Sequence, residues 1–229
     1  MNPNYGKYIR RVLAIGAAAF LSACASSDSV VKNYPDTATR NAPIAAPLSG
    51  PVEPAARVVG SYTVTAVNVT VPETLRVSEA NRFYPGGDIV WREDPIGNRY
   101  EQVAKIMKDG ISAGASDFQG ARAVELDVIV HRFHALTEKA RYTVGGVHAI
   151  QFDLRIRDAE TGAVIEAPRT VVADFDALGG QAAIAAEARG VTQKVRIQQQ
   201  LAHVIRQELG SAQGYVAQDL GFMGALNQL

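Results

Sequence analysis

The sequence predicts an α+β fold: a largely antiparallel, twisted sheet with two main helices packed on one face. Residues 124–130 and 148–157 alternate apolar and polar side chains with the period of two that a half-covered strand requires. Residues 98–114 and 181–209 instead repeat their apolar positions at helical spacing. The clean alternation favours antiparallel pairing with one face in water, because parallel strands covered on both faces read as continuous apolar runs.

The first strand is expected from Val58 to Val71, a segment rich in valine, threonine and tyrosine. Its alternation changes parity between Ala66 and Val67, which predicts a β-bulge at that point. A turn at Pro85–Gly87 then leads into a short strand, Asp88–Arg92, which carries the single tryptophan of the chain.

The first helix is expected to begin after Asn98, because an asparagine side chain can accept from the free amide groups of a first helical turn. Glu101 follows three residues later, at the spacing of a capping box. Apolar residues then recur at helical spacing from Tyr100 to Gly110. The pattern indicates one amphipathic helix that ends around Ala113.

The two clearest strands each have one apolar and one polar face. On the first, the apolar face holds Val124, Leu126, Val128 and Val130, and on the second it holds Ile150, Phe152, Leu154 and Ile156. A hairpin turn is expected at Asp158–Gly162, since Gly162 can take a positive φ. A further strand is then expected from Ala163 to Asp174, around Pro168.

The last helical region begins with an alanine-rich segment, Gln181–Arg189. Beyond it, apolar residues between Val191 and Leu209 form a stripe over about half of a helix circumference, as a helix lying on a sheet requires. Gly190 either lies inside one long helix or divides two helices. Gly210 is expected to serve as the C-cap.

The N-terminus has the order of a secretory signal. Lys7, Arg10 and Arg11 precede the apolar run Val12–Phe20, which is followed by Leu21–Cys24. The nine residues of the apolar run would reach only ~14 Å as a helix, and a bilayer core is ~30 Å thick. The run is therefore not expected to span a membrane.

Together, these basic, apolar and Leu-Ser-Ala-Cys elements resemble the signal peptide and lipobox of bacterial lipoproteins. In that family the cysteine thiol receives a diacylglycerol, cleavage occurs just before the cysteine, and the new amino group is acylated. The resemblance implies that Cys24 carries the lipid and becomes the first residue of the mature protein. The alternatives for Cys24 are an incidental buried thiol or half of an intermolecular disulfide.

The residues after Cys24 bear on the destination. In the lipoprotein family, retention in the inner membrane goes with an acidic residue directly after the lipidated cysteine. This chain has Ala25 and Ser26 there. The resemblance therefore implies a protein anchored in the outer membrane, with its domain facing the periplasm.

The chain is expected to divide into four parts. Five of the ten prolines fall between residues 25 and 57 without a sustained period, which indicates a disordered tether. The parts are a lipoprotein signal peptide (1–23), the lipidated cysteine with a Pro/Ala/Ser tether (24–57), an α+β periplasmic domain (58–210) and a C-terminal tail (211–229). The tail is weakly apolar and is either frayed or docked on the domain or on a partner.

Charge argues against nucleic acid as a partner. Three of the 23 basic residues and none of the 23 acidic residues lie in the expected signal, so the mature chain would carry a formal charge of about minus three. Proteins that follow a phosphate backbone display clustered basic faces instead. The expected partners are the membrane, through the N-terminal lipid anchor, and an envelope protein; no cofactor is expected.

Histidines at positions 131, 134 and 148 raise the question of a metal site. On a strand, a spacing of three puts the rings of His131 and His134 on opposite faces, unlike ligands spaced by four on a helix. No cysteine or paired carboxylate completes a ligand set. No metal site is expected.

The acids Asp127, Asp153 and Asp174 are expected on polar strand faces, where solvated charge is the default. No serine lies in the sequence context of a nucleophile elbow, and Cys24 would be lipidated. No catalytic residues are expected, and the protein is not expected to be an enzyme.

The region that runs from Ile89–Arg92 through Arg132–Glu138 and Gly145–Ile150 to the turn at Asp158–Gly162 is similar to a domain-of-unknown-function family of bacterial lipoproteins. The resemblance implies an outer-membrane lipoprotein with a non-enzymatic structural or accessory role in the envelope. The order of strands and helices is also similar to that of envelope lipoproteins that accompany transport or outer-membrane assembly machines, which makes an auxiliary role the alternative. A periplasmic hydrolase is the third alternative.

The polar face of the two clearest strands is the predicted partner face. A wet strand face is either plain solvated surface or a place where a partner docks. Its residues are Glu125, Asp127, Gln151, Asp153 and Arg155.

Overall fold

The computed structural model describes residues 59–221, which form one open six-stranded sheet with four helices. The predicted signal peptide, Cys24, the tether and the last eight residues of the predicted tail lie outside the described residues. In chain order the elements are β1 (Tyr62–Thr70), β2 (Ile89–Val90), α1 (Arg99–Ala115), β3 (Arg122–His134), α2 (Glu138–Arg141), β4 (Gly146–Asp158), β5 (Val164–Val172), β6 (Phe175–Ala177), α3 (Gly180–Glu187) and α4 (Gln193–Gly210).

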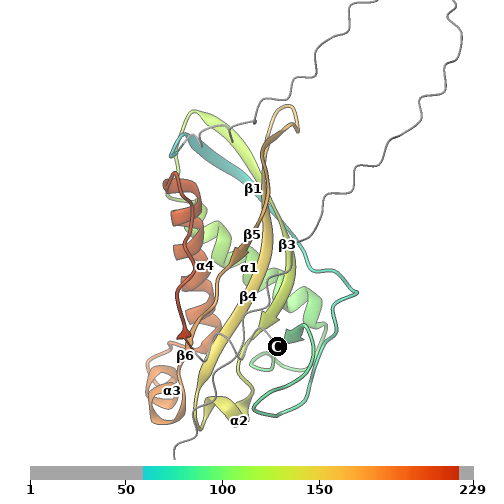
Figure 1. The fold of residues 1–229 in the computed structure, drawn as a ribbon, viewed down its shortest axis with the longest axis vertical. Helices are drawn as coiled ribbons and strands as arrows, with labels where there is room; N and C mark the ends of the chain where they lie inside the picture. Colours follow the sequence, from blue (N-terminus) through green and yellow to red (C-terminus); the bar gives the residue numbers. More distant parts are fainter. Residues whose placement is uncertain (1–58, 222–229) are drawn as a thin grey trace, which may run out of the picture. The chain divides into compact units, whose positions relative to one another are not determined.

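The sheet has the strand order β1-β3-β4-β5 (Figure 1), with β2 on the same edge of β3 as β1 and β6 paired with β4. The pairs β3–β4, β4–β5 and β4–β6 are antiparallel. This confirms the prediction of a mixed α+β fold with a mostly antiparallel sheet. The parallel pairing of β1 and β2 with β3 was not predicted; β1 and β3 are joined by α1, and parallel neighbours require such a crossover.

Two β-bulges interrupt the pairing of β3 with its neighbours. One lies in β1 between Val64 and Ala66, close to the parity change seen in the sequence. The other lies in β3, where the register shifts between Val130 and Arg132 and leaves His131 as the extra residue. A bulge of one residue reverses the alternation of all residues beyond it.

The helix ends follow local chemistry. The Asn98 side chain accepts from the amide groups of Tyr100 and Glu101, as the capping prediction required. Gly190, at a φ of 77°, separates α3 from α4, so the region holds two helices. The expected C-cap at Gly210 is wrong: the amide of Ser211 still donates to the Gln207 carbonyl, so the helix continues through Gly210 and Ser211 takes the cap position.

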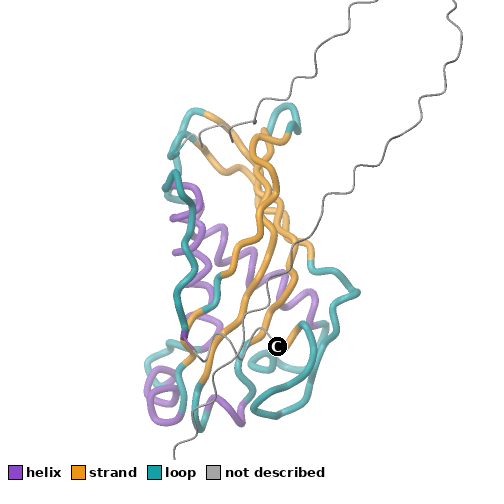
Figure 2. Tube along the Cα trace, viewed as in Figure 1, coloured by secondary structure: helices purple, strands orange, loops and turns teal. Residues whose placement is uncertain are grey.

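The core lies between one face of the sheet and the two long helices α1 and α4 (Figures 1 and 2). Every residue predicted for the apolar faces of β3 and β4 is buried, and Leu126, Phe152 and Leu154 are completely so. Burying one such side chain stabilises a fold by about 1.5–3 kcal/mol. From α1, Val103, Ile106, Met107 and Ile111 join the core, and from α4, Ile197, Leu201, Val204, Ile205 and Leu209.

The start of the described domain lies against the end of α4. The amide of Gly60, just before β1, donates to the carbonyl of Leu209 in the last turn of α4 at 3.1 Å. After α4 the chain turns back, and the Tyr215 hydroxyl accepts from Gln200 at 3.1 Å while its ring meets His203 edge to face. Among residues 59–221 no helix is both long enough and apolar enough to cross a membrane.

Two glycines let α1 and α4 approach closely. A Cβ built on Gly114 would stand 2.4 Å from the carbonyl oxygen of Ala202, and one on Gly110 would stand 2.9 Å from the Cβ of Leu201. The atom facing Gly114 belongs to backbone, so it cannot move aside without shifting α4. These two positions therefore set the separation of the two helices.

We expect Gly114→Ala to destabilise the domain by about 1–3 kcal/mol through overpacking against α4. In an ordinary helix interior the same change stabilises by about 1 kcal/mol, so the sign itself is diagnostic. The measurement is chemical denaturation followed by circular dichroism. The control is Gly210→Ala, also in a helix, where a Cβ would meet only the Phe118 ring at 3.6 Å; equal behaviour of the two variants would contradict the close packing.

Candidate functional site

The predicted partner face lies on the side of the sheet away from α1 and α4. Alternation along β3 and β4 places the five predicted residues on this side, which we call the open face: Glu125, Asp127, Gln151, Asp153 and Arg155. Each is partly exposed, whereas the residues between them are buried. The open face therefore presents charged side chains held by a rigid pair of long strands.

Most of these charges are paired with one another across β3 and β4. Asp127 lies at the centre: its Oδ2 accepts from Arg157 Nε at 2.6 Å and from Arg155 Nε at 3.2 Å, and Asn68 Nδ2 donates to its Oδ1. Arg157 also reaches Glu125 at 2.8 Å. The hydrogen bond from Arg157 is the main reason that the pKa of Asp127 lies below its usual value.

A second group on the open face joins His131, Asp153 and Thr170. The Asp153 carboxylate accepts from the Thr170 hydroxyl at 2.7 Å and contacts His131 Nε2 at 2.9 Å. The Thr170 bond, then His131, lowers the pKa of Asp153. A catalytic triad needs the hydroxyl on the histidine, but here hydroxyl and imidazole both bind the carboxylate, so the histidine cannot take the hydroxyl proton.

Sequence reasoning left several of these partners out. Arg157 continues the alternation of β4 and could have been added from the pattern. Asn68 and Thr170 could not, because they come from β1 and β5 and their place depends on strand order and register. Asp174 was expected on the surface, yet it is buried between β5 and β6. Its Oδ1 accepts a hydrogen bond from the Ile150 amide at 2.9 Å, and burial raises the pKa of its carboxyl group.

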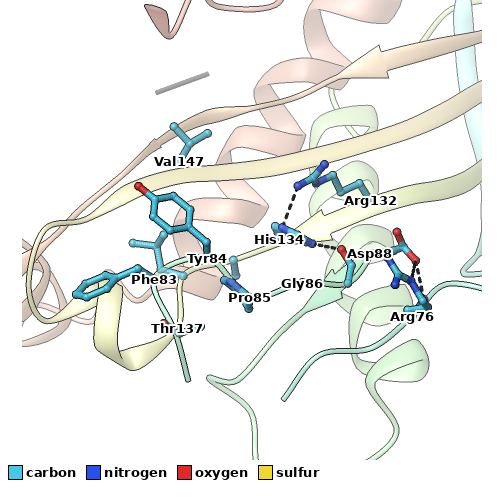
Figure 3. A pocket seen from close by; sticks show the side chains of 13 residues that line it. Arg76, Phe83, Tyr84, Pro85, Gly86, Asp88, Arg132, His134, Thr137 and Val147 are labelled. Atoms are coloured by element: carbon cyan, nitrogen blue, oxygen red, sulfur yellow. Dashed lines mark hydrogen bonds and ion pairs between the residues drawn. The ribbon is translucent and has the colours of Figure 1, made fainter. Parts of the chain in front are cut away.

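At one end of the open face the loop before β2 lies over the sheet and borders an open-sided cavity of about 530 Å³ (Figure 3). Arg132 and His134 line it from β3, and Val147 lines it from β4. The loop contributes Phe83 and Tyr84, whose side chains stand beside the cavity in Figure 3. We call this space the Arg132 cavity.

Arg132 and His134 are held in a fixed arrangement. His134 Nε2 lies 2.7 Å from the Gly87 carbonyl oxygen and can only donate to it, so Nδ1 is free to accept from Arg132 Nη2 at 3.3 Å. Gly87 has a φ of 137°, which few other residues adopt, and this conformation aims its carbonyl at the ring. Burial, followed by the charge of Arg132, lowers the pKa of His134 to about 4. The imidazole is therefore neutral at physiological pH.

The histidines do not converge. His131 lies on the open face by the ordinary alternation of β3, and the bulge turns Arg132 and His134, paired with Gln151 and Ala149, to the same side, so the predicted opposite placement is wrong. The buried His148 packs on Phe175 instead. Within residues 59–221 no three histidine, cysteine or acidic side chains are grouped as a metal site would need.

A family model matches residues 62–225, more than half of the chain, and its description is a family of unknown function, DUF6778. The chain belongs to this family. No curated protein is similar enough to match it.

Solved structures with some likeness include three bacterial proteins. A Caulobacter crescentus protein assigned to the lipoproteins is 17% identical, with 66% of this chain and 88% of that one covered and a TM-score of 0.34. A Xanthomonas campestris protein of the DUF330 family is 14% identical, with 69% and 86% covered and a TM-score of 0.39. PelC of Paraburkholderia phytofirmans, a dodecamer, is 14% identical, with 63% and 92% covered and a TM-score of 0.26. Similarity at this level carries no functional argument.

The buried imidazole of His134 should make the stability of the domain depend on pH. Unfolded, a histidine binds its proton near pH 6.5, but folded His134 binds it only near pH 4. The unfolded state therefore holds more protons between these values, and stability falls as pH is lowered through this window, by about 1.4 kcal/mol per pH unit for one histidine. His134→Gln should remove that share of the slope between pH 6 and 5, measured by urea denaturation; an unchanged slope would show that His134 is protonated in the folded protein.

Proposed function

We propose that this protein is a lipoprotein anchored in the outer membrane through Cys24, and that its domain acts as a non-enzymatic accessory component of the cell envelope. The anchor rests on the lipobox resemblance of Leu21–Cys24, and the destination rests on Ala25 and Ser26. Several acyl chains on one cysteine would hold a protein to a bilayer firmly, whereas one chain binds reversibly. The tether would let the domain stand off the membrane.

The open face is the observation that best supports a binding role. It presents rigid, charge-paired side chains from strands that the helices leave uncovered. The carboxylates of Asp127 and Asp153 have lowered pKa values, so they stay ionised and are poorly suited to exchange protons near neutral pH. Such a surface suits an electrostatically complementary partner better than it suits catalysis.

Cys24→Ser tests the anchor. The variant should remain an unprocessed precursor that no longer incorporates labelled palmitate, because no thiol is left to accept a diacylglycerol. The native protein should sediment with outer-membrane fractions in a density gradient. Palmitate incorporation by the variant would refute the lipobox, and native protein in inner-membrane fractions would refute the destination.

Ile129 offers a test of the partner face. Its side chain is 38% exposed and lies on β3 within the open face, beside Asp127. A photo-crosslinking residue at position 129, introduced into the full chain in growing cells, should give one discrete adduct with an envelope protein. The control is position 96, where Ile96 is 95% exposed in the loop before α1 and should give none.

Two outcomes of this experiment would contradict the docking proposal. If neither position gives an adduct, the open face is solvated surface. If both positions give the same products, the crosslinks report crowding and not a specific interface. The charge-neutralising variant Arg155→Met should reduce the adduct at position 129 while leaving the melting temperature within a few degrees, because exposed ion pairs contribute little to stability.

A further inference from the structure

The Arg132 cavity contains a positive charge that forms no ion pair among residues 59–221. The single side-chain hydrogen bond of Arg132 within residues 59–221 goes to His134, and its buried Nε has no partner. Buried or half-buried guanidinium groups are normally paired with carboxylates, as Arg169 is with Glu166 and Glu208 in this same domain. Arg132, which forms no ion pair at the wall of the cavity, therefore has free N–H groups that could donate to an anion entering from outside.

The acids near Arg132 do not supply that acceptor. Asp88 is turned toward Arg76, accepting its amide at 2.8 Å and lying 3.6 Å from its guanidinium. Asp174 is close enough for the charge of Arg132 to act on its carboxyl group, but it is buried and its Oδ1 accepts from the Ile150 amide. Neither forms an ion pair with Arg132.

His134 acts as the support for this group. Its Nε2–H is committed to the Gly87 carbonyl, so its Nδ1 can only accept, and it fixes one edge of the Arg132 guanidinium. A neutral imidazole adds no positive charge that would pull the anion away from Arg132. The arginine is thus oriented before any ligand arrives, which reduces the entropy lost on binding.

The other side of the cavity is apolar and aromatic. Phe83 and Tyr84 are 42% and 72% exposed, although they stand next to the cavity, and Leu136 and Val147 line it as well. Large aromatic side chains exposed beside a basic group match a ligand with a charged head and an apolar body. The volume of about 530 Å³ lies within the range of sites for small organic molecules.

From this juxtaposition we infer that the Arg132 cavity binds an amphiphilic anion, a phosphate or carboxylate attached to an apolar group. The guanidinium of Arg132 holds the oxyanion, and Phe83 and Tyr84 cover the apolar part. The same chemistry occurs in a free alkyl phosphate or fatty acid and in an anionic lipid headgroup. This inference concerns a site separate from the docking contact at Ile129, so either can fail alone.

Hexyl phosphate is the probe for the first measurement, with the processed full-length protein held in an uncharged detergent. Calorimetric titration should show saturable binding of hexyl phosphate and much weaker binding of inorganic phosphate and of hexanol, because each lacks one half of the ligand. Arg132→Met keeps an unbranched apolar stem but removes the guanidinium group, and it should weaken hexyl phosphate binding at least ten-fold. Arg155→Met, on the open face outside the cavity, should change it less than two-fold.

Tyr84→Ala keeps the test decisive if Arg132→Met fails to fold, since Tyr84 is largely exposed. This variant should weaken binding of hexyl phosphate several-fold and leave that of inorganic phosphate unchanged. Absence of saturable hexyl phosphate binding to the native protein would overturn the inference. So would equal losses in Arg132→Met and Arg155→Met, which would indicate only general electrostatic attraction.

A second measurement separates the two sources of the anion. The processed protein is reconstituted into vesicles of zwitterionic lipid, with or without one fifth anionic phospholipid, and titrated with hexyl phosphate. If hexyl phosphate binding is lost in the anionic vesicles and does not return when the bulk salt concentration is raised, the lipid headgroup is the ligand. Equal binding in both identifies a free anion, and both results support the site.

Discussion

The paired strands β3 and β4 divide their side chains between two environments with incompatible requirements. On one side, Leu126, Phe152 and Leu154 must lose all contact with water, and on the other, charged residues must keep it. Because successive residues of a strand point to opposite sides, both requirements are met in the same thirteen-residue strands. The helix pair, the ion pairs of the open face and the Arg132 cavity all depend on this division.

The division of β3 and β4 into a buried and an exposed side could be predicted because it depends on the local sequence alone. Alternation between positions 124 and 130 and between 148 and 157 survives in the fold, as do the cap at Asn98 and the bulge in β1. These features depend on residues within a few positions of each other. They therefore needed no knowledge of how distant segments meet.

The remainder depends on contacts between distant segments. The parallel pairing of β1 with β3 leaves no mark in the alternation of either strand. The bulge at His131 reversed the parity of Arg132 and His134, and the Arg132 cavity exists only because the loop carrying Gly87 lies against β3. The sequence before β2 has no period that could have placed that loop. The candidate ligand site was therefore missed, while the polar residues of the open face were found.

The hydrogen bond between Gly60 and Leu209 bears on how the chain reaches this structure. The first strand and the last long helix must both be present before the core can close, which gives the domain a high contact order. A chain that emerges N-terminus first exposes the apolar sides of β3 and β4 until the final helix follows. Folding is then a single late event, and the nascent domain needs shielding from aggregation during that interval.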